Sequence, residues 1–158
     1  MSTGTIPEDD QEQSQSELKD VGKTLGNVEF EPAKFTIHRQ VERSLDTQFS
    51  KERQHPVYIA KLPSHCVSMN VGIIVAGGTG GNHRHYYESM IYVIKGKGYS
   101  MVEGINVEWE AGDVIYVPPW AWHQHFNTDA DKEVRYIAST NAPLLQNVGN
   151  IARREEAV

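Results

Sequence analysis

Residues 89–118 contain the stretch SMIYVIKGKGYSMVEGINVEWEAGDVIYVP, in which short runs of Val, Ile, Tyr and Trp are separated by Gly, Asp and Pro. Within this stretch, Ile105, Val107 and Trp109 alternate with polar residues. Such alternation is typical of a strand that buries one face and exposes the other to water. Gly104 marks a tight turn just before that strand. The stretch therefore predicts consecutive antiparallel strands joined by short turns.

The same composition extends in both directions from this stretch. The runs HPVYIAKL at residues 55–62, VSMNVGIIVA at residues 67–76 and VRYIAST at residues 134–140 are also rich in Val, Ile and Tyr. Several short strands separated by turn residues favour an antiparallel sandwich or barrel. We find no internal repeat. We therefore predict a single all-β domain over residues 56–142.

The segments that flank this domain have a different composition. Residues 1–20 are acidic and poor in large apolar side chains, so we expect a disordered tail. Residues 21–55 are interpreted as an N-terminal arm, in which QVERSLDTQFSKER at residues 40–53 predicts a short helix. Residues 143–158 predict a C-terminal arm or a short helix.

Composition narrows the possible partners and the compartment. The chain has 158 residues, a net charge of −6 and one cysteine, Cys66, so it cannot form an internal disulfide. It has no basic stripe for nucleic acid, no apolar run long enough to cross a membrane and no secretory pattern at its start. We therefore expect a cytoplasmic protein that binds a small molecule, and neither nucleic acid nor a membrane.

Two histidines lie two residues apart in the stretch GGNHRHYYES, residues 80–89. In an extended segment, residues two apart share a face, so His83 and His85 point the same way and Arg84 points the other way. Two imidazoles on the inner face of a barrel make half of a metal site. The alternative is a pair of histidines in a surface hairpin or at the mouth of a barrel.

A second pair of histidines occurs in AGDVIYVPPWAWHQHFN, residues 111–127. If this segment lies across from the first pair, His123 supplies a third nitrogen ligand. His125 is then a spare ligand, or a group that contacts another ligand or the substrate. Three histidines from two segments predict a metal site with open positions.

The two stretches together resemble the motifs of the cupin superfamily. The first motif of that family has an HxH pair, a glutamate and a later glycine, and the second has a glycine, a proline, a histidine and an asparagine at fixed spacing. The resemblance covers residues 57–142 and implies a single metal-binding jelly-roll β-barrel. The matching residues are His83, His85, Gly96, Gly112, Pro118, His123 and Asn127.

The sequence departs from these motifs at two positions. Trp120 stands where the second motif has a glycine, and Ser89 stands where the first motif has its glutamate. Glu88 lies one residue too early, and alternation directs it away from the metal unless a bulge turns it back. We therefore expect His83, His85 and His123 as ligands, with Glu88 as a fourth ligand only in the presence of such a bulge.

Within the superfamily, the sequence is most similar in motif to the gentisate 1,2-dioxygenase branch. That branch carries a Pro-Pro-Trp-x-Trp-His-x-His stretch, found here at residues 118–125, and binds Fe(II) through three histidines. It is usually built from two cupin units, and this chain has one. The resemblance implies Fe(II). Imidazole ligands also suit Zn, Mn or Ni.

The main functional hypothesis is an Fe(II) dioxygenase that acts on a small aromatic or hydroxylated acid. The alternatives are a non-redox metal-dependent isomerase, lyase or decarboxylase, and a non-catalytic protein that binds a small ligand. The candidate pocket residues are Tyr86, Trp120, Trp122 and His125, although the tryptophans are equally typical of packing over the end of a barrel. An apolar β surface and the N-terminal arm also predict a homodimer.

Overall fold

The computed structural model describes residues 37–149 and 151–157. The predicted tail at residues 1–20 and the first part of the predicted arm lie outside the described residues. In chain order, the elements are η3 (Val41–Arg43), α1 (Thr47–Arg53), β1 (Val57–Ile59), β2 (Ser68–Ile74), β3 (His83–His85), β4 (Ser89–Lys95), β5 (Lys97–Val102), β6 (Ile105–Glu110), β7 (Val114–Val117), β8 (His123–Asn127), β9 (Val134–Thr140), α2 (Ala142–Asn147) and β10 (Arg154–Glu156).

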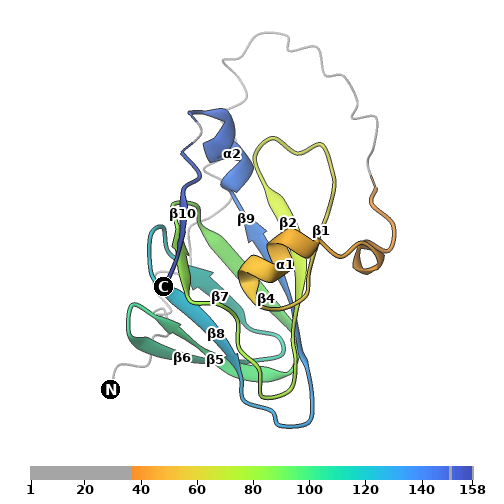
Figure 1. Cartoon of the computed structure of the whole chain (residues 1–158), viewed down its shortest axis with the longest axis vertical. Helices are drawn as coiled ribbons and strands as arrows, with labels where there is room; N and C mark the ends of the chain where they lie inside the picture. Colours follow the sequence, from red (N-terminus) through yellow and green to blue (C-terminus); the bar gives the residue numbers. More distant parts are fainter. Residues whose placement is uncertain (1–36, 150, 158) are drawn as a thin grey trace, which may run out of the picture. The chain divides into compact units, whose positions relative to one another are not determined.

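The described strands form two antiparallel sheets (Figure 1). One sheet has the order β1-β2-β9-β4-β7 and the other has the order β10-β3-β8-β5-β6. Strands that are consecutive in the chain often lie in different sheets, which is the arrangement of a jelly roll. The all-β fold predicted from the sequence is confirmed.

The core lies between the two sheets and follows the alternation of the sequence. In β4, Ile91 and Val93 are buried while Tyr92 between them is exposed. Trp109 reaches the same core from β6 of the other sheet. Each fully buried side chain of this size stabilises the fold by roughly 1.5–3 kcal/mol. Alternation therefore places one face of each sheet inside, and the metal-site candidates lie on that face.

Two short helices, η3 and α1, precede the predicted domain. Asp46 caps α1 by accepting a hydrogen bond of 2.9 Å from the Phe49 N–H, and the last residue of α1, Arg53, is buried. The predicted short helix at residues 40–53 is present as η3 and α1. No helix among the described residues is long and apolar enough to cross a bilayer.

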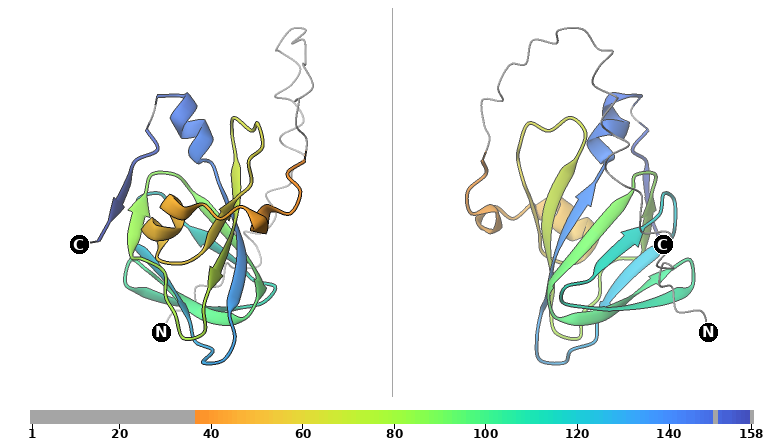
Figure 2. Two further views of the ribbon diagram at one scale, coloured as in Figure 1. Left: turned by 45° about the vertical axis from the view of Figure 1, so that its right-hand side comes forward. Right: turned by 180° about the vertical axis from the view of Figure 1, so that it is seen from behind.

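The C-terminal segment, for which the sequence predicts an arm or a short helix, contains one helix and one strand among its described residues. It forms the short helix α2 and then the strand β10, which pairs antiparallel with β3 at the edge of the second sheet (Figure 2). In this pairing, Arg154 lies opposite His85. Pairing covers the exposed backbone of β3, the strand that carries two of the candidate ligands.

Gly98 in β5 is required by close packing. A Cβ atom at this position would overlap the carbonyl oxygen of Phe126 and lie 2.6 Å from Cη2 of Trp109. We expect Gly98→Ala to lower the free energy of unfolding by about 3 kcal/mol, because neither backbone nor indole can move aside freely. Thermal or urea unfolding measures this change.

Gly104→Ala is the matched control for that substitution. Gly104 has a φ of +78°, but, its own chain neighbours aside, no atom of the described residues lies within 4 Å of its added Cβ. Only the backbone penalty of about 1 kcal/mol therefore applies. Equal losses in the two variants would contradict the packing argument.

Candidate metal centre

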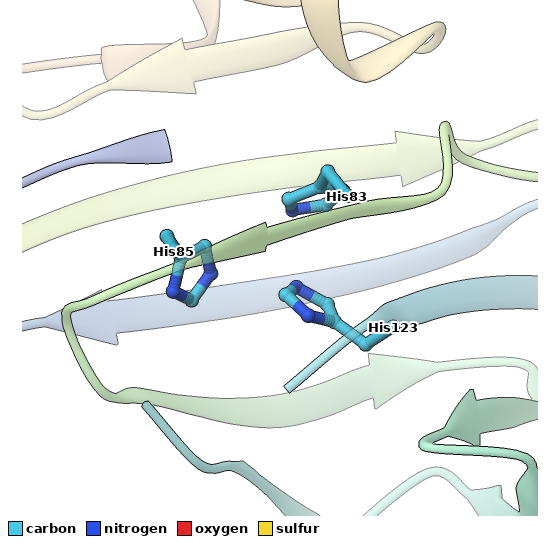
Figure 3. Close-up of side chains that lie close together, drawn as sticks. All are labelled: His83, His85 and His123. Atoms are coloured by element: carbon cyan, nitrogen blue, oxygen red, sulfur yellow. The ribbon is translucent and has the colours of Figure 1, made fainter. Parts of the chain in front are cut away.

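Three histidines converge between the sheets (Figure 3). His83 and His85 point inward from β3, and His123 points toward them from the first position of β8. His83 and His123 are register partners in the second sheet. One ligand atom from each ring lies within 4.8 Å of the other two. All three residues are buried, so the cluster is inside the protein.

Backbone carbonyls select the tautomer of each ring in the cluster. Nδ1 of His83 lies 2.8 Å from the Gly81 oxygen. Nδ1 of His123 lies 2.8 Å from the Ala121 oxygen, and His85 makes the same contact with the Tyr87 oxygen at 2.7 Å. A carbonyl only accepts, so each Nδ1 carries the proton and each Nε2 keeps its lone pair. This orientation by backbone is typical of metal-ligating histidines.

Burial keeps these imidazoles neutral. Desolvation, with the nearby charges of His123 and Arg53, lowers the pKa of His85 to about 3. Desolvation lowers the pKa of His123 to about 4. The pKa of His83 is also lowered far below its ordinary value, first by burial and then by the charge of Arg53. At neutral pH the Nε2 atom of each of the three rings therefore carries no proton that would compete with a metal ion.

Glu88 does not join the cluster. Its side chain is exposed, its N–H donates to Asn141 Oδ1 at 2.9 Å, and its carboxylate accepts from the Tyr116 hydroxyl at 3.4 Å. The next residue, Ser89, is buried and borders the same cavity as the histidines. Alternation without a bulge at this position thus leaves a serine where a fourth ligand would lie.

The histidines open into a cavity of about 360 Å³. Its size is within the range of sites that hold small molecules. His125, a candidate from the sequence, borders this cavity and is 8% exposed. Part of the wall is apolar and includes Val57, Ile91 and Ala138. The cavity thus combines an apolar wall with a cluster of nitrogen ligands.

The other three pocket candidates lie on the outer side of β3. Arg84 points away from the cavity, and its guanidinium lies 4.2 Å from the Trp120 ring and 4.7 Å from the Trp122 ring. Tyr86 stacks on Trp120 with a ring separation of 4.1 Å and is 42% exposed. Tyr86 lies two residues after Arg84 and faces the same outer side, so the prediction that it lines the cavity is corrected. For Trp120 and Trp122, the stacking on Tyr86 and Arg84 supports the second of the two alternatives, packing over the end of the barrel.

Residues 70–140 match the cupin domain family model. Together with the two sheets and the histidine cluster, this match identifies the fold. This segment is a cupin domain. Three curated relatives share part of the sequence. A 5-aminosalicylate 1,2-dioxygenase from Comamonas sp is 39% identical over 67 residues, which make up 42% of this chain and 17% of that protein. A gentisate 1,2 dioxygenase 1 from Aquipseudomonas alcaligenes is 32% identical over 74 residues, which make up 46% of this chain and 21% of that protein. A 1-methylthio-D-xylulose 5-phosphate methylsulfurylase from Rhodospirillum rubrum is 30% identical over 88 residues, which make up 52% of this chain and 56% of that protein.

Solved structures show the same cupin fold. A salicylate 1,2-dioxygenase from Pseudaminobacter salicylatoxidans matches with a TM-score of 0.61 at 20% identity, over 66% of this chain and 32% of that chain. A cupin-2 domain from Rhodospirillum rubrum matches with a TM-score of 0.55 at 19% identity, over 67% of each chain. The chain spans about a fifth of the length of the two curated dioxygenases named above.

Trp120, which stands where the cupin motif has a glycine, adopts a backbone conformation that glycine favours. Its φ is +62°, in the left-handed region that favours glycine. Its N–H donates to the His85 carbonyl at 2.6 Å, so this turn is tied to the ligand strand. The contacts of its ring with Tyr86 and Arg84 help to hold Trp120 in this backbone conformation, which L-residues rarely adopt.

Arg53 is a cavity residue that sequence reasoning missed. It is 8% exposed and borders the cavity with the histidines. Nη2 donates to the Tyr87 hydroxyl at 2.9 Å, while Nη1 has no hydrogen-bond partner among the described residues. The guanidinium carbon lies 4.6 Å from the Phe49 ring centroid. Nothing in the sequence distinguishes this arginine from an ordinary solvated residue at the end of a short helix.

His55 and Tyr136 form a neutral hydrogen-bonded pair in the cavity wall. His55 Nδ1 lies 2.7 Å from the Arg53 carbonyl, so Nδ1 carries the proton. The Tyr136 hydroxyl then donates to His55 Nε2 at 2.6 Å. Burial lowers the pKa of His55 to about 4 and raises the pKa of Tyr136 to about 12. His55 lies outside both cupin motifs, and only the fold brings it to Tyr136.

The pKa of His55 predicts an acid-sensitive fold. His55 titrates at 6.5 in the unfolded chain and at about 4 in the folded protein. Between these values unfolding takes up a proton, so stability decreases as the pH falls. In metal-free protein, we expect the free energy of unfolding of His55→Gln to fall less steeply with decreasing pH than that of the wild type. The two slopes should differ by up to about 1.4 kcal/mol per pH unit. Urea unfolding at several pH values measures both slopes.

The exposed residue His65 provides the control for this measurement. His65→Gln should leave the slope unchanged. Equal slopes in wild type and His55→Gln would contradict the assignment of the proton uptake to His55.

Arg154 brings a second guanidinium to the cavity from β10. Its Nη1 donates to Glu52 at 3.1 Å, and it forms an ion pair with Glu156. Burial and the charge of Arg53 lower the pKa of Arg154 from its ordinary value. Nε and Nη2 of Arg154 are also buried without a hydrogen-bond partner among the described residues. Arg154 nevertheless has two carboxylates beside it, whereas Arg53 forms no ion pair within the same residues, so Arg53 carries the less compensated positive charge in the cavity.

Proposed function

We propose that this cupin domain binds Fe(II) through Nε2 of His83, His85 and His123 and acts as a dioxygenase on a small aromatic or hydroxylated acid. One observation supports this proposal above the others: the three neutral imidazoles border the same cavity as Arg53, whose Nη1 has no hydrogen-bond partner in the described part of the chain. Two relatives, which share about two fifths of this chain, are named as 1,2-dioxygenases of 5-aminosalicylate and of gentisate.

The neutral donor set fits a divalent ion with open positions. When bound, such an ion supplies coordination sites for a bidentate anionic substrate and dioxygen. Arg53 would pair with the carboxylate of the substrate, since its Nη1 lacks another acceptor. Ile91 and Val57 would contact the ring and exclude water from one side of it. The neutral His55–Tyr136 pair adds hydrogen-bonding groups without adding charge to the cavity.

Metal analysis combined with oxygen uptake tests the proposal. The protein is purified without added metal and without oxygen, and it is then assayed on dihydroxybenzoates, catechols and hydroxy acids. We expect about one iron atom per chain and oxygen consumption that depends on an acid substrate. Stoichiometric Zn, Mn or Ni without oxygen uptake would contradict the dioxygenase proposal.

A second candidate is a non-redox metal-dependent enzyme, such as an isomerase, lyase or decarboxylase. The Rhodospirillum rubrum relative, which matches over 56% of its own length, is named as a methylsulfurylase and not as a dioxygenase, so a second reaction class is worth testing. In that case the ion acts as a Lewis acid. Turnover without oxygen distinguishes this candidate from the dioxygenase. Ligand binding without any product would instead indicate a non-catalytic binding protein.

We also propose a homodimer that uses the outer face of the first sheet. Exposed apolar side chains gather on β4 and β7, where Met90 lies opposite Tyr116 and Tyr92 lies opposite Val114. Such a patch is typical of an interaction surface. A monomeric mass in solution would contradict the dimer. The location in the cytoplasm stays a prediction from the single cysteine.

A further inference from the structure

A buried hydrogen-bond chain lies behind the cavity and ends at His125. Trp109 Nε1 donates to Ser100 Oγ at 2.9 Å, and Ser100 Oγ lies 2.7 Å from Nδ1 of His125. The chain crosses three neighbouring strands, because Ser100 in β5 pairs in register with His125 in β8, and β6 supplies the tryptophan. Ser100 is fully buried, and both of its partners are less than a tenth exposed.

The direction of each hydrogen bond follows from the donors available. An indole N–H only donates, so Ser100 Oγ accepts from Trp109. The serine proton then needs an acceptor in a fully buried position, and among the described residues Nδ1 of His125 is the one within reach. Nδ1 therefore accepts. A neutral His125 in turn carries its proton on Nε2.

This tautomer is opposite to that of the three clustered histidines. His83, His85 and His123 donate from Nδ1 to carbonyls and keep Nε2 as a lone pair. His125 instead presents an N–H, and its Nε2 has no hydrogen-bond partner among the described residues. Its ring centroid lies 5.6 Å from that of His123. A protonated Nε2 beside the cluster suits a hydrogen bond to a ligand and does not suit metal ligation.

We propose that Ser100 and Trp109 are positioning residues that hold His125 as a neutral Nε2–H donor toward an oxygen atom of the anion bound beside the three histidines. The identity of that anion rests on the proposed function, whereas the tautomer of His125 does not. The sequence left two roles open for His125, a spare metal ligand or a group that contacts the substrate. In this proposal His125 contacts the bound anion and does not bind the metal.

The tautomer is tested by two-bond ¹H–¹⁵N NMR correlation on ¹⁵N-labelled, zinc-loaded protein. Zinc is diamagnetic and binds imidazole, and the protonated and unprotonated ring nitrogens of a neutral histidine have well-separated ¹⁵N shifts. We expect Nε2–H in the wild type, and a shift toward Nδ1–H in Ser100→Ala. Trp109→Phe keeps an aromatic ring in the core but loses the indole donor, so it should give a mixture of both tautomers. Ser44→Ala, at an exposed serine, is the control.

Ligand affinity provides the second readout. Calorimetric titration of the zinc-loaded protein with salicylate should give a Kd raised about tenfold in Ser100→Ala, the effect of one hydrogen bond that is misdirected. An Nδ1–H tautomer in the wild type, or an unchanged tautomer in Ser100→Ala, would overturn the proposal. Failure of the wild type to bind salicylate, together with no oxygen uptake on any acid, would instead overturn the proposed function, and the NMR result would still decide the role of Ser100.

Discussion

Replacing His123 by alanine is expected to remove both the metal and the activity. His123 is the one member of the cluster that comes from β8, and its loss leaves two ligands on a single short strand. Loss of a partner that only orients a ligand already costs about 10- to 100-fold in metal affinity or activity. Loss of a ligand itself should exceed about 100-fold. Elemental analysis and oxygen uptake of the purified variant measure the two effects.

The exposed residue His65 offers a matched control, since His65→Ala removes an imidazole that lies outside the cluster. This control should keep the wild-type iron content and rate. A cavity is left where the buried His123 ring was, so circular dichroism must first show that His123→Ala is folded. Full iron occupancy in a folded His123→Ala protein would reject the proposed ligand set.

Arg53→Met is expected to weaken acid binding while stabilising the ligand-free fold. Methionine keeps an unbranched side chain against Phe49 but removes the guanidinium and its unpaired Nη1. Hydrogen bonds to charged groups contribute roughly 1.5–3 kcal/mol, so the Kd for salicylate should rise by about 10- to 100-fold. The affinity for catechol, which lacks a carboxylate, should change much less. The free energy of unfolding should rise by about 1 kcal/mol, because an incompletely paired buried charge is lost.

Arg43→Met is the control for that experiment, because Arg43 is exposed in η3. It should change neither the salicylate affinity nor the stability. The opposite pattern in Arg53→Met, with lower stability and unchanged salicylate affinity, would show that Arg53 supports the fold and does not bind the acid. The two readouts together therefore separate a binding role from a structural role.

Much of the fold follows from local patterns in the sequence. Alternation in residues 105–110 predicts that Ile105, Val107 and Trp109 share an inward face. Trp109 is buried as predicted, whereas Val107 is half-buried and Ile105, at the start of β6, is exposed. Because a strand directs successive side chains to opposite faces, the same rule places His83 and His85 together and Glu88 outside. These inferences require only the neighbours of each residue along the chain.

The same rule explains why Tyr86 lies outside the cavity, and packing over the barrel end is the alternative that fits Trp120 and Trp122. Proximity to His85 and His123 in the sequence suggested that Tyr86, Trp120 and Trp122 share the cavity, but Tyr86 is adjacent to a ligand and so faces the other side of the sheet. Trp120 itself has a positive φ, a conformation that no alternation rule describes. Its ring lies over Arg84 and outside the cavity.

The sequence by itself determined the β architecture, the shared face of His83 and His85, and the pair of histidine motifs, since each of these depends on spacing within one short segment. The tertiary structure alone decided what surrounds the cluster. Arg53 comes from α1, Tyr136 from β9 and Arg154 from β10, and no spacing relates these residues to the motifs. The tautomer of His125 likewise depends on a serine and a tryptophan in two other strands. Hydrogen bonds and charges act through space, so the chemistry of the cavity depends on which distant segments the fold brings together.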